Sequence, residues 1–157
     1  MFELIQIQEN SIYINDICCL LTRYYDLIFS NYVNPIASFF SELQKEKVVV
    51  IAAIKEGKLI AFLVVYNFQK ISKNSFNCFI YGAAVRSVAF ELDLAMNYIF
   101  DDLKEKGCNV VRLETKEYNM PMRKMANRLG FSKVGCLHNS CLLNGEYKNT
   151  ILYEKIL

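Results

Sequence analysis

The sequence predicts an α/β protein in which one mixed sheet carries helices on both faces. Three observations support this prediction. Segments with strand patterns alternate with segments of helical spacing along the chain. A strand, a helix and another strand within residues 76–115 form a βαβ unit, whose two strands should be parallel. Two glycine-containing turns each join neighbouring apolar runs, which predicts two hairpins. The 157 residues fit a single domain spanning 1–157.

A strand and two helices are expected at the start of the chain. FELIQI (2–7) alternates apolar and polar residues, as a half-buried strand does. Residues 11–29 carry apolar side chains at helical spacing, and Ser11 is placed to act as the N-cap. The next helix should begin at Asn34-Pro35, because asparagine caps helices and proline suits the first helical position. Its inward-facing side chains are expected to be Phe39, Phe40 and Leu43.

A hairpin and a central strand are expected next. VVVIAAI (48–54) and LIAFLVVYNF (59–68) flank KEGK, where Gly57 is free to adopt a positive φ. FNCFIYGAAV (76–85) is apolar enough to be a central strand. Gly82 within it would weaken that strand unless a bulge or a close approach requires the missing side chain.

The second half of the chain continues the alternation. Residues 86–106 form a helix with one apolar face, ended by Gly107, and NVVRLET (109–115) is a strand. YNMPMRKMANRLGF (118–131) predicts a short helix with Asn119 as N-cap, Pro121 in the first turn and Gly130 after the last turn. Its apolar stripe consists of Met122, Met125, Ala126 and Leu129. A last hairpin turns at Asn144-Gly145, which gives the order β-α-α-β-β-β-α-β-α-β-β.

Composition argues against several classes of function. The hydrophobic fraction is 54% and the mean hydropathy is +0.17, yet no apolar run reaches the roughly 18 to 20 residues of a membrane span. The N-terminal residues do not resemble a secretory signal, so we expect a cytoplasmic protein with no membrane partner. A net charge of +2 without a basic block argues against a nucleic-acid partner. Six cysteines and one histidine lack metal-ligand spacing, so we expect no metal and reduced thiols, most of them in the core.

The order of elements, together with residues 119–131, resembles the GNAT superfamily of acyl-CoA-dependent N-acyltransferases. The last helix of that family often reads Asn, then a small or apolar residue, then Gly-Phe; the matching residues here are Asn119, Met122, Gly130 and Phe131. The tail is similar to the branch that acetylates ribosomal-protein N-termini, which tends to carry a glycine after Gly-Phe and an Asn-Gly-x-Tyr hairpin. The matching residues are Gly135, Asn144, Gly145 and Tyr147.

The resemblance implies that acetyl-CoA binds where the two parallel strands splay apart, with the first strand bulged near Gly82. The N-terminus of the helix over 86–106 would then meet the pyrophosphate. The turn at 86–91 lacks the glycines of the family's phosphate loop. Helix capping alone would also explain Asn119. The implied cofactor contacts are Tyr81, Ala83, Ala84, Val85, Arg86, Ser87, Val88, Ala89, Phe90, Asn119 and Arg123.

The reaction that the resemblance implies is direct attack of a neutral amine on the thioester. Glu114, near the end of its strand, is the candidate base, although it could instead pair with Arg112 or Lys116 at the surface. His138 is a second candidate, but a single histidine on a strand is more often structural. The family's usual tyrosine acid is replaced by Ala126. The candidate proton donors for the thiolate are therefore Tyr118 and Tyr147.

An aromatic region would form the acceptor pocket, with Tyr24, Tyr25 and Tyr32 as expected substrate contacts. The expected acceptor is a primary amine on a small molecule, an amino sugar or a protein N-terminus. The apolar composition is compatible with a homodimer. Two other functions stay open: a binding module whose phosphate loop has decayed, and an acyltransferase that takes its acyl group from an acyl carrier protein.

Overall fold

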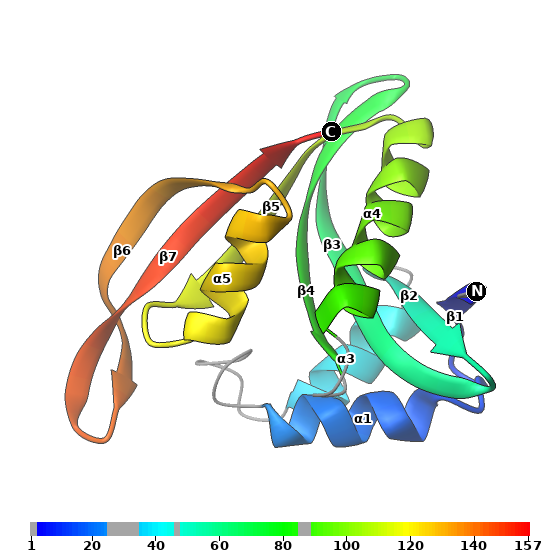
Figure 1. The fold of residues 1–157 in the computed structure, drawn as a ribbon, viewed down its shortest axis with the longest axis horizontal. Helices are drawn as coiled ribbons and strands as arrows, with labels where there is room; N and C mark the ends of the chain where they lie inside the picture. The colour runs from blue at the N-terminus through cyan, green and yellow to red at the C-terminus, as the bar shows by residue number, and fades with distance from the viewer. Residues whose placement is uncertain (1–2, 25–34, 46–47, 85–88) are drawn as a thin grey trace.

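A computed structural model describes residues 3–24, 35–45, 48–84 and 89–157 (Figure 1). The chain forms one seven-stranded mixed sheet in the order β1-β2-β3-β4-β5-β7-β6, so the predicted α/β class is confirmed. The elements are β1 (Glu3–Ile7), α1 (Ile14–Arg23), α3 (Pro35–Gln44), β2 (Val48–Lys55), β3 (Lys58–Ser72), β4 (Ser75–Ala84), α4 (Ala89–Glu105), β5 (Cys108–Lys116), α5 (Met120–Arg128), β6 (Ser132–Leu143) and β7 (Glu146–Ile156).

The two faces of the sheet carry separate hydrophobic cores. Helices α4 and α5 pack against one face, where Met96, Ile99, Phe100 and Leu129 are buried. Helices α1 and α3 pack against the other face, where Ile17, Leu21 and Phe39 are buried. Phe40 and Leu43 pack partly buried against that second core, so the inward face predicted for the helix starting at Pro35 is confirmed.

The start of α1 differs from the prediction. Helix α1 begins at Ile14, and Tyr13 occupies the N-cap position without a side-chain capping bond. Ser11 instead lies in the preceding turn, where its N–H donates to the carbonyl of Gln8 at 3.0 Å and its Oγ accepts from the N–H of Tyr13 at 3.4 Å. The prediction of Ser11 as N-cap was therefore wrong, because this extra turn delays the helix.

Both predicted hairpins are present, and in each the chain turns through two residues whose backbone has a left-handed conformation, with positive φ. Glu56 and Gly57 have φ of 52° and 72°, and Asn144 and Gly145 have φ of 51° and 81°. These values are typical of the two-residue turns that match the twist of antiparallel strands. A further long hairpin joins β3 to β4, and its outer residues in β3, from Asn67 on, are exposed.

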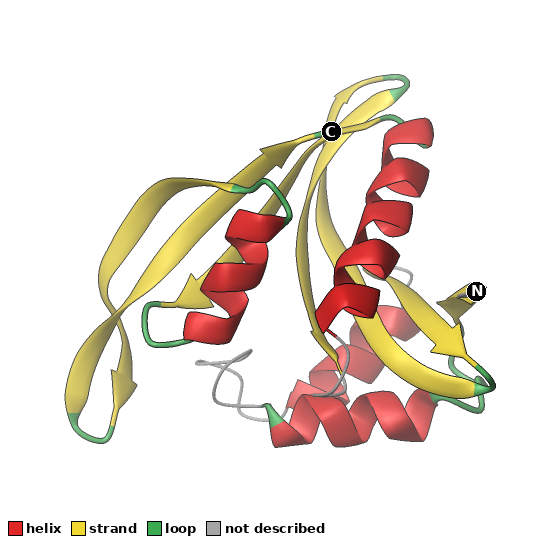
Figure 2. Cartoon of the chain, viewed as in Figure 1, coloured by secondary structure: helices red, strands yellow, loops and turns green. Residues whose placement is uncertain are grey.

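The parallel pair β4 and β5 separates towards its C-terminal ends. Their ladder runs from Phe76–Cys108 to Ile80–Leu113. Beyond it, residues 81–84 stay paired with β3, while residues 114–116 stay paired with β7. The sheet therefore divides into two arms, with α4 beside one and α5 beside the other (Figure 2). This confirms the splayed central strands that the family resemblance implied.

Gly82 is required by a close approach and not by a bulge. The register between β3 and β4 is regular from Ala61–Ala84 to Tyr66–Phe79, so the predicted bulge at Gly82 is not found in that ladder. A Cβ at Gly82 would lie 2.2 Å from the backbone oxygen of Phe62. Glycine therefore lets β3 and β4 run close together at the point where β5 departs.

The six cysteines are free thiols, but the core holds only half of them. Cys78, Cys108 and Cys141 are buried, whereas Cys18 and Cys136 are half-buried and Cys19 is exposed. The Sγ atoms of Cys78 and Cys108 lie 3.6 Å apart across the parallel strands. Hydrogen bonding to Cys108, followed by burial, raises the pKa of the Cys78 thiol. The prediction that most cysteines lie in the core was therefore only partly right.

Candidate active site

The loop between β5 and α5 is built around Asn119. Its Oδ1 accepts a hydrogen bond from the N–H of Met122 at 3.3 Å, and its own N–H donates to the carbonyl of Lys116 at 2.9 Å. Gly130 has a φ of 78° after the last turn of the helix. The predicted caps of this helix are thus confirmed, and Asn119 is fixed at the mouth of the helix directly after the splayed end of β5.

The carboxylate of Glu117 fixes the same loop to β7 through two hydrogen bonds. The Oε1 atom of Glu117 accepts from the N–H of Asn149 at 3.0 Å, and Oε2 accepts from Asn149 Nδ2 at 2.9 Å. Hydrogen bonds from Asn149 hold the pKa of the Glu117 carboxyl below its ordinary range because they favour the charged form. Arg123 closes the loop from the helix side, since its NH1 donates to the carbonyl of Glu117 at 2.9 Å. Neither Glu117 nor Asn149 could be recognised from the sequence, because their pairing depends on strand register.

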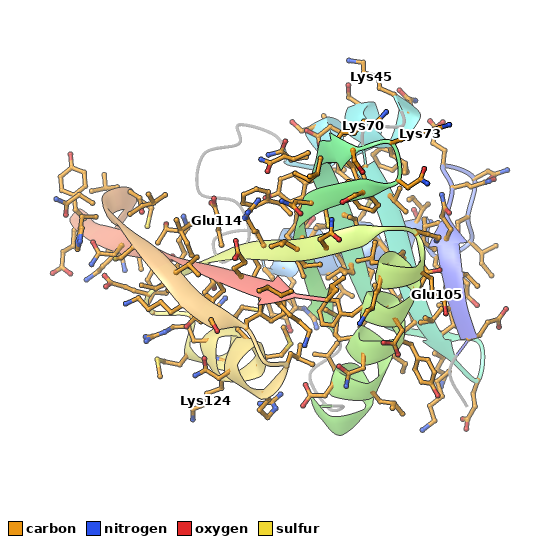
Figure 3. All side chains as sticks on the ribbon, turned by 90° about the horizontal axis from the view of Figure 1, so that it is seen from above. Lys45, Lys70, Lys73, Glu105, Glu114 and Lys124 are labelled. Atoms are coloured by element: carbon orange, nitrogen blue, oxygen red, sulfur yellow. The ribbon has the colours of Figure 1, made fainter. Side chains whose placement is uncertain are left out.

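Glu114 lies on the splayed part of β5 and is exposed. Among the described residues, no hydrogen bond or ion pair to its carboxylate is found. Arg112 pairs with Glu154 at 2.9 Å, and Lys116 Nζ donates to Thr150 Oγ1 at 3.1 Å, so neither forms the surface pair considered for Glu114. Figure 3 shows the labelled lysines, Lys45, Lys70, Lys73 and Lys124, well away from it. The carboxylate is therefore available to accept a proton.

Side chains alternate between the two faces of β5 at this point. Leu113 is buried in the core under α4 and α5, and Thr115 pairs across β7 with Ile151 of the same core. Glu114 and Lys116 consequently face the side that carries α1 and α3. A base candidate and a threonine hydroxyl thus stand at successive positions on opposite faces of one splayed strand.

Two buried polar atoms, one in the separated part of β5 and one in α5, lack a hydrogen-bond partner among the described residues. They are Thr115 Oγ1 and Arg123 Nε. The Thr115 residue is 3% exposed. A buried polar atom without a partner costs about 1–3 kcal/mol, so such atoms are rare and point to a ligand or another missing partner. Arg123 was predicted from the sequence as a site residue but Thr115 was not, because nothing in the sequence shows that this hydroxyl is buried without a hydrogen-bond partner.

The other catalytic candidates are Tyr118, His138 and Tyr147. They differ in how far along the chain they lie from the point where β4 and β5 separate. Tyr118 is half-buried and directly precedes Asn119. His138 is exposed in β6, where the register with β7 is interrupted between Leu137 and Cys141. Tyr147 is exposed and follows the first residue of β7, close to the turn of the last hairpin. Of the three, Tyr118 is the one joined directly to the loop that carries Asn119.

The residues expected to contact the cofactor or substrate are only partly within the described structure. Tyr81 and Ala83 pack towards the face of α1 and α3, where the Tyr81 ring meets Tyr66 with centroids 5.4 Å apart. Ala84 ends β4, and Ala89 and Phe90 begin α4. Tyr24 follows α1 and is half-buried. The residues that lie outside the described structure are Tyr25, Tyr32, Val85, Arg86, Ser87 and Val88.

The part of the chain that the structure describes offers neither a cluster of metal ligands nor a membrane-spanning helix. Within the described residues, no group of three or more His, Cys, Asp or Glu side chains could hold a metal ion. Over the same part of the chain, every helix is too short or too polar to cross a membrane.

The comparisons with known proteins identify the family. The model of the Acetyltransferase (GNAT) family matches residues 14–131, which is most of the chain. The chain therefore belongs to the GNAT acetyltransferase family, and the resemblance predicted from the sequence is confirmed. No curated protein matches the sequence significantly.

Solved acetyltransferase structures share the fold at low sequence identity. Arabidopsis thaliana NAA60, solved with a bisubstrate analogue, aligns with a TM-score of 0.71 and 19% identity over 99% of this chain and 98% of that one. The same plant protein has been solved with acetyl-CoA. The ribosomal-protein-S5-alanine acetyltransferase of Vibrio fischeri aligns with a TM-score of 0.74 and 13% identity over 99% and 92% of the two chains. An N-acetyltransferase of Staphylococcus aureus Mu50 aligns with a TM-score of 0.74 and 15% identity over 99% and 97%.

Proposed function

We propose that this GNAT protein is an N-acetyltransferase that moves an acetyl group from acetyl-CoA to a primary amine by direct attack. The observation that carries the proposal is the separation of β4 and β5 beyond Ile80 and Leu113 in a chain of this family. Solved structures of the same fold include complexes with acetyl-CoA and with a bisubstrate analogue, which supports acetyl-CoA as donor and an amine such as a peptide end as acceptor.

The donor would enter from the side of α4 and α5. Asn119 and Arg123 stand at the start of α5, and α4 begins at Ala89, shortly after β4 ends. Helix N-termini attract phosphate because their N–H groups and dipoles point outward. Arg123 Nε, buried without a partner among the described residues, gives this side a further donor for an anionic or carbonyl group. We assign Asn119 and Arg123 to the cofactor on these grounds.

The acceptor would enter from the side of α1 and α3. Glu114 faces that side and is exposed, and Tyr24 is half-buried at the end of α1. A carboxylate there can take a proton from the attacking amine, directly or through water. Tyr118, next to Asn119, is the proton donor for the departing thiolate that we favour over Tyr147, because the loop that carries it begins at the splayed end of β5.

A titration of the purified protein with acetyl-CoA tests this proposal. Binding to the native state alone should raise the unfolding free energy by about 2.7 kcal/mol at 100 times the dissociation constant. Thermal unfolding measured with acetyl-CoA, with ADP and with acetyl-pantetheine separates the contributions of the two ends of the donor. No shift with millimolar acetyl-CoA would overturn the proposal. A shift with acetyl-pantetheine alone would favour an acyl carrier protein as donor.

A further inference from the structure

On the face of α4 and α5, one pair of residues follows the last rung of the parallel ladder. Ile80 and Leu113 form that rung, and both are buried in the core of this face. The next side-chain positions on the same face are Gly82 in β4 and Thr115 in β5. Gly82 brings no side chain to the point where the strands part. Thr115 therefore supplies the first polar side chain of this face beyond the ladder.

The Thr115 hydroxyl is buried and forms no hydrogen bond within the described structure. The residue is 3% exposed, and Oγ1 has no hydrogen-bond partner among the described residues. Thr150, the other buried threonine of the described part, has a hydroxyl bonded to Lys116 at 3.1 Å and to Ser140 at 2.7 Å. Ala126 of α5 is fully buried in the core of the same face and has no polar side-chain group. An unmatched hydroxyl in this position is thus a donor without an acceptor.

We propose that the Thr115 hydroxyl donates a hydrogen bond to the coenzyme A sulfur and stabilises it as the thiolate leaves. The proposal rests on the proposed function and names one more group of the same site. It follows from the alternation along β5: Glu114 faces the acceptor side, and Thr115, one residue on, faces the donor side. A thioester held between the splayed strands would have its attacking amine on one side of β5 and its sulfur on the other.

The step balances without a proton from Thr115. The amine nitrogen forms a bond to the thioester carbonyl carbon, and the proton it loses goes to Glu114 or to water. The carbon–sulfur bond then breaks, and the sulfur leaves with the electron pair as a thiolate, to be protonated by Tyr118 or by water. The threonine hydroxyl keeps its proton and stabilises the charge on sulfur through a charge-assisted hydrogen bond.

Equilibrium binding of coenzyme A and of desulfo-coenzyme A, which lacks the sulfur, tests the proposal without knowledge of the acceptor. Calorimetric titrations at about pH 9.5, where a substantial fraction of an alkyl thiol is ionised, compare the wild type with Thr115→Val. The wild type should bind coenzyme A about tenfold more tightly than the desulfo analogue, a typical effect of a hydrogen bond to a charged group. Thr115→Val should lose that preference and keep its affinity for the desulfo analogue, whereas Thr115→Ser should retain the preference.

Further variants show whether a change in the affinity ratio comes from the Thr115 hydroxyl itself. Valine has the shape of threonine without the hydroxyl, so Thr115→Val should fold, and Thr115→Ala gives a second variant without it. Thr150→Val removes the other buried threonine hydroxyl and should leave the ratio of the two affinities unchanged. An unchanged ratio in both Thr115 variants would overturn the role of Thr115 while leaving the proposed function standing. Failure of the wild type to bind either compound would overturn the proposed function, and this proposal with it.

Discussion

Asn149 holds both carboxylate oxygens of Glu117: its backbone N–H donates to Oε1 at 3.0 Å and its side-chain Nδ2 donates to Oε2 at 2.9 Å. In the same place, the N–H of Glu117 donates to the carbonyl of Asn149 at 2.9 Å. Three hydrogen bonds therefore join β7 to the residue directly before Tyr118 and Asn119. The pair fixes the loop that carries these two candidate site residues.

We predict that Glu117→Gln lowers the melting temperature at pH 7. Glutamine cannot accept both hydrogen bonds from Asn149, and it lacks the charge that Lys148 and Arg123 favour. Because the folded-state pKa of Glu117 lies below its unfolded value of about 4.3, its contribution is full above that value. The contribution is lost as the pH falls through the folded-state pKa. The difference between the two melting temperatures should therefore shrink as the pH falls below about 4.3 in a thermal scan.

Glu114→Gln is the matched control for this experiment. Glu114 is exposed on the same strand end and has no partner found among the described residues. The melting temperature of Glu114→Gln should equal that of the wild type at pH 7. If the difference in melting temperature between Glu117→Gln and the wild type stayed constant down to about pH 3, Asn149 would not be stabilising the charged form of Glu117.

Gly82→Ala should destabilise the fold by about 1–3 kcal/mol, as overpacking of a tight interior does. The added Cβ would lie 2.2 Å from the oxygen of Phe62, a backbone atom that cannot move without shifting β3. Gly135→Ala is the control, since its Cβ would meet the side chain of Leu152 at 3.2 Å, which can rotate away. That variant should stay within about 0.5 kcal/mol of wild type in urea unfolding. Equal losses in the two variants would contradict the close approach of β3.

The order of elements could be predicted from the sequence because each local signal agrees with the fold. The turns at Gly57 and Gly145, the caps at Asn119 and Gly130 and the apolar stripe of α5 act within a few residues of the chain. The prediction for Ser11 failed because a second turn competes for its hydroxyl and its backbone groups. For Gly82 the sequence left a bulge and a close approach open, because the choice depends on how β3 lies against β4.

The site could be predicted less completely, since most of it depends on pairing between distant segments. Glu114 and Asn119 could be named as candidates because they stand at the ends of recognisable elements. The link from Glu117 to Asn149 spans 32 residues and exists only in the β5–β7 register. The buried, unmatched state of Thr115 likewise requires three-dimensional packing. No pattern in the sequence reports either fact.

Asn119 has a capping role that can be separated from a cofactor role. Asn119→Ala should cost about 1 kcal/mol of folding free energy through loss of the cap to Met122. Asn119→Ser keeps an oxygen that can cap the helix and removes the amide, so its stability should be close to that of wild type. If the amide contacts acetyl-CoA, both variants should bind it several-fold more weakly in calorimetric titration. Unchanged affinity in Asn119→Ser would leave Asn119 as a cap alone.

Glu114→Gln should reduce the rate of acetyl transfer by about 10²- to 10⁴-fold, the usual contribution of a well-placed general base. The probe is a set of short peptides and small primary amines, with release of coenzyme A followed by a thiol reagent. The loss should appear in kcat and shrink at higher pH, because more of the amine is then neutral without help. Glu105→Gln, which changes an exposed carboxylate at the far end of α4, should leave the rate unchanged (Figure 3). A full rate in Glu114→Gln at pH 7 would mean that another group, or solvent, takes the proton.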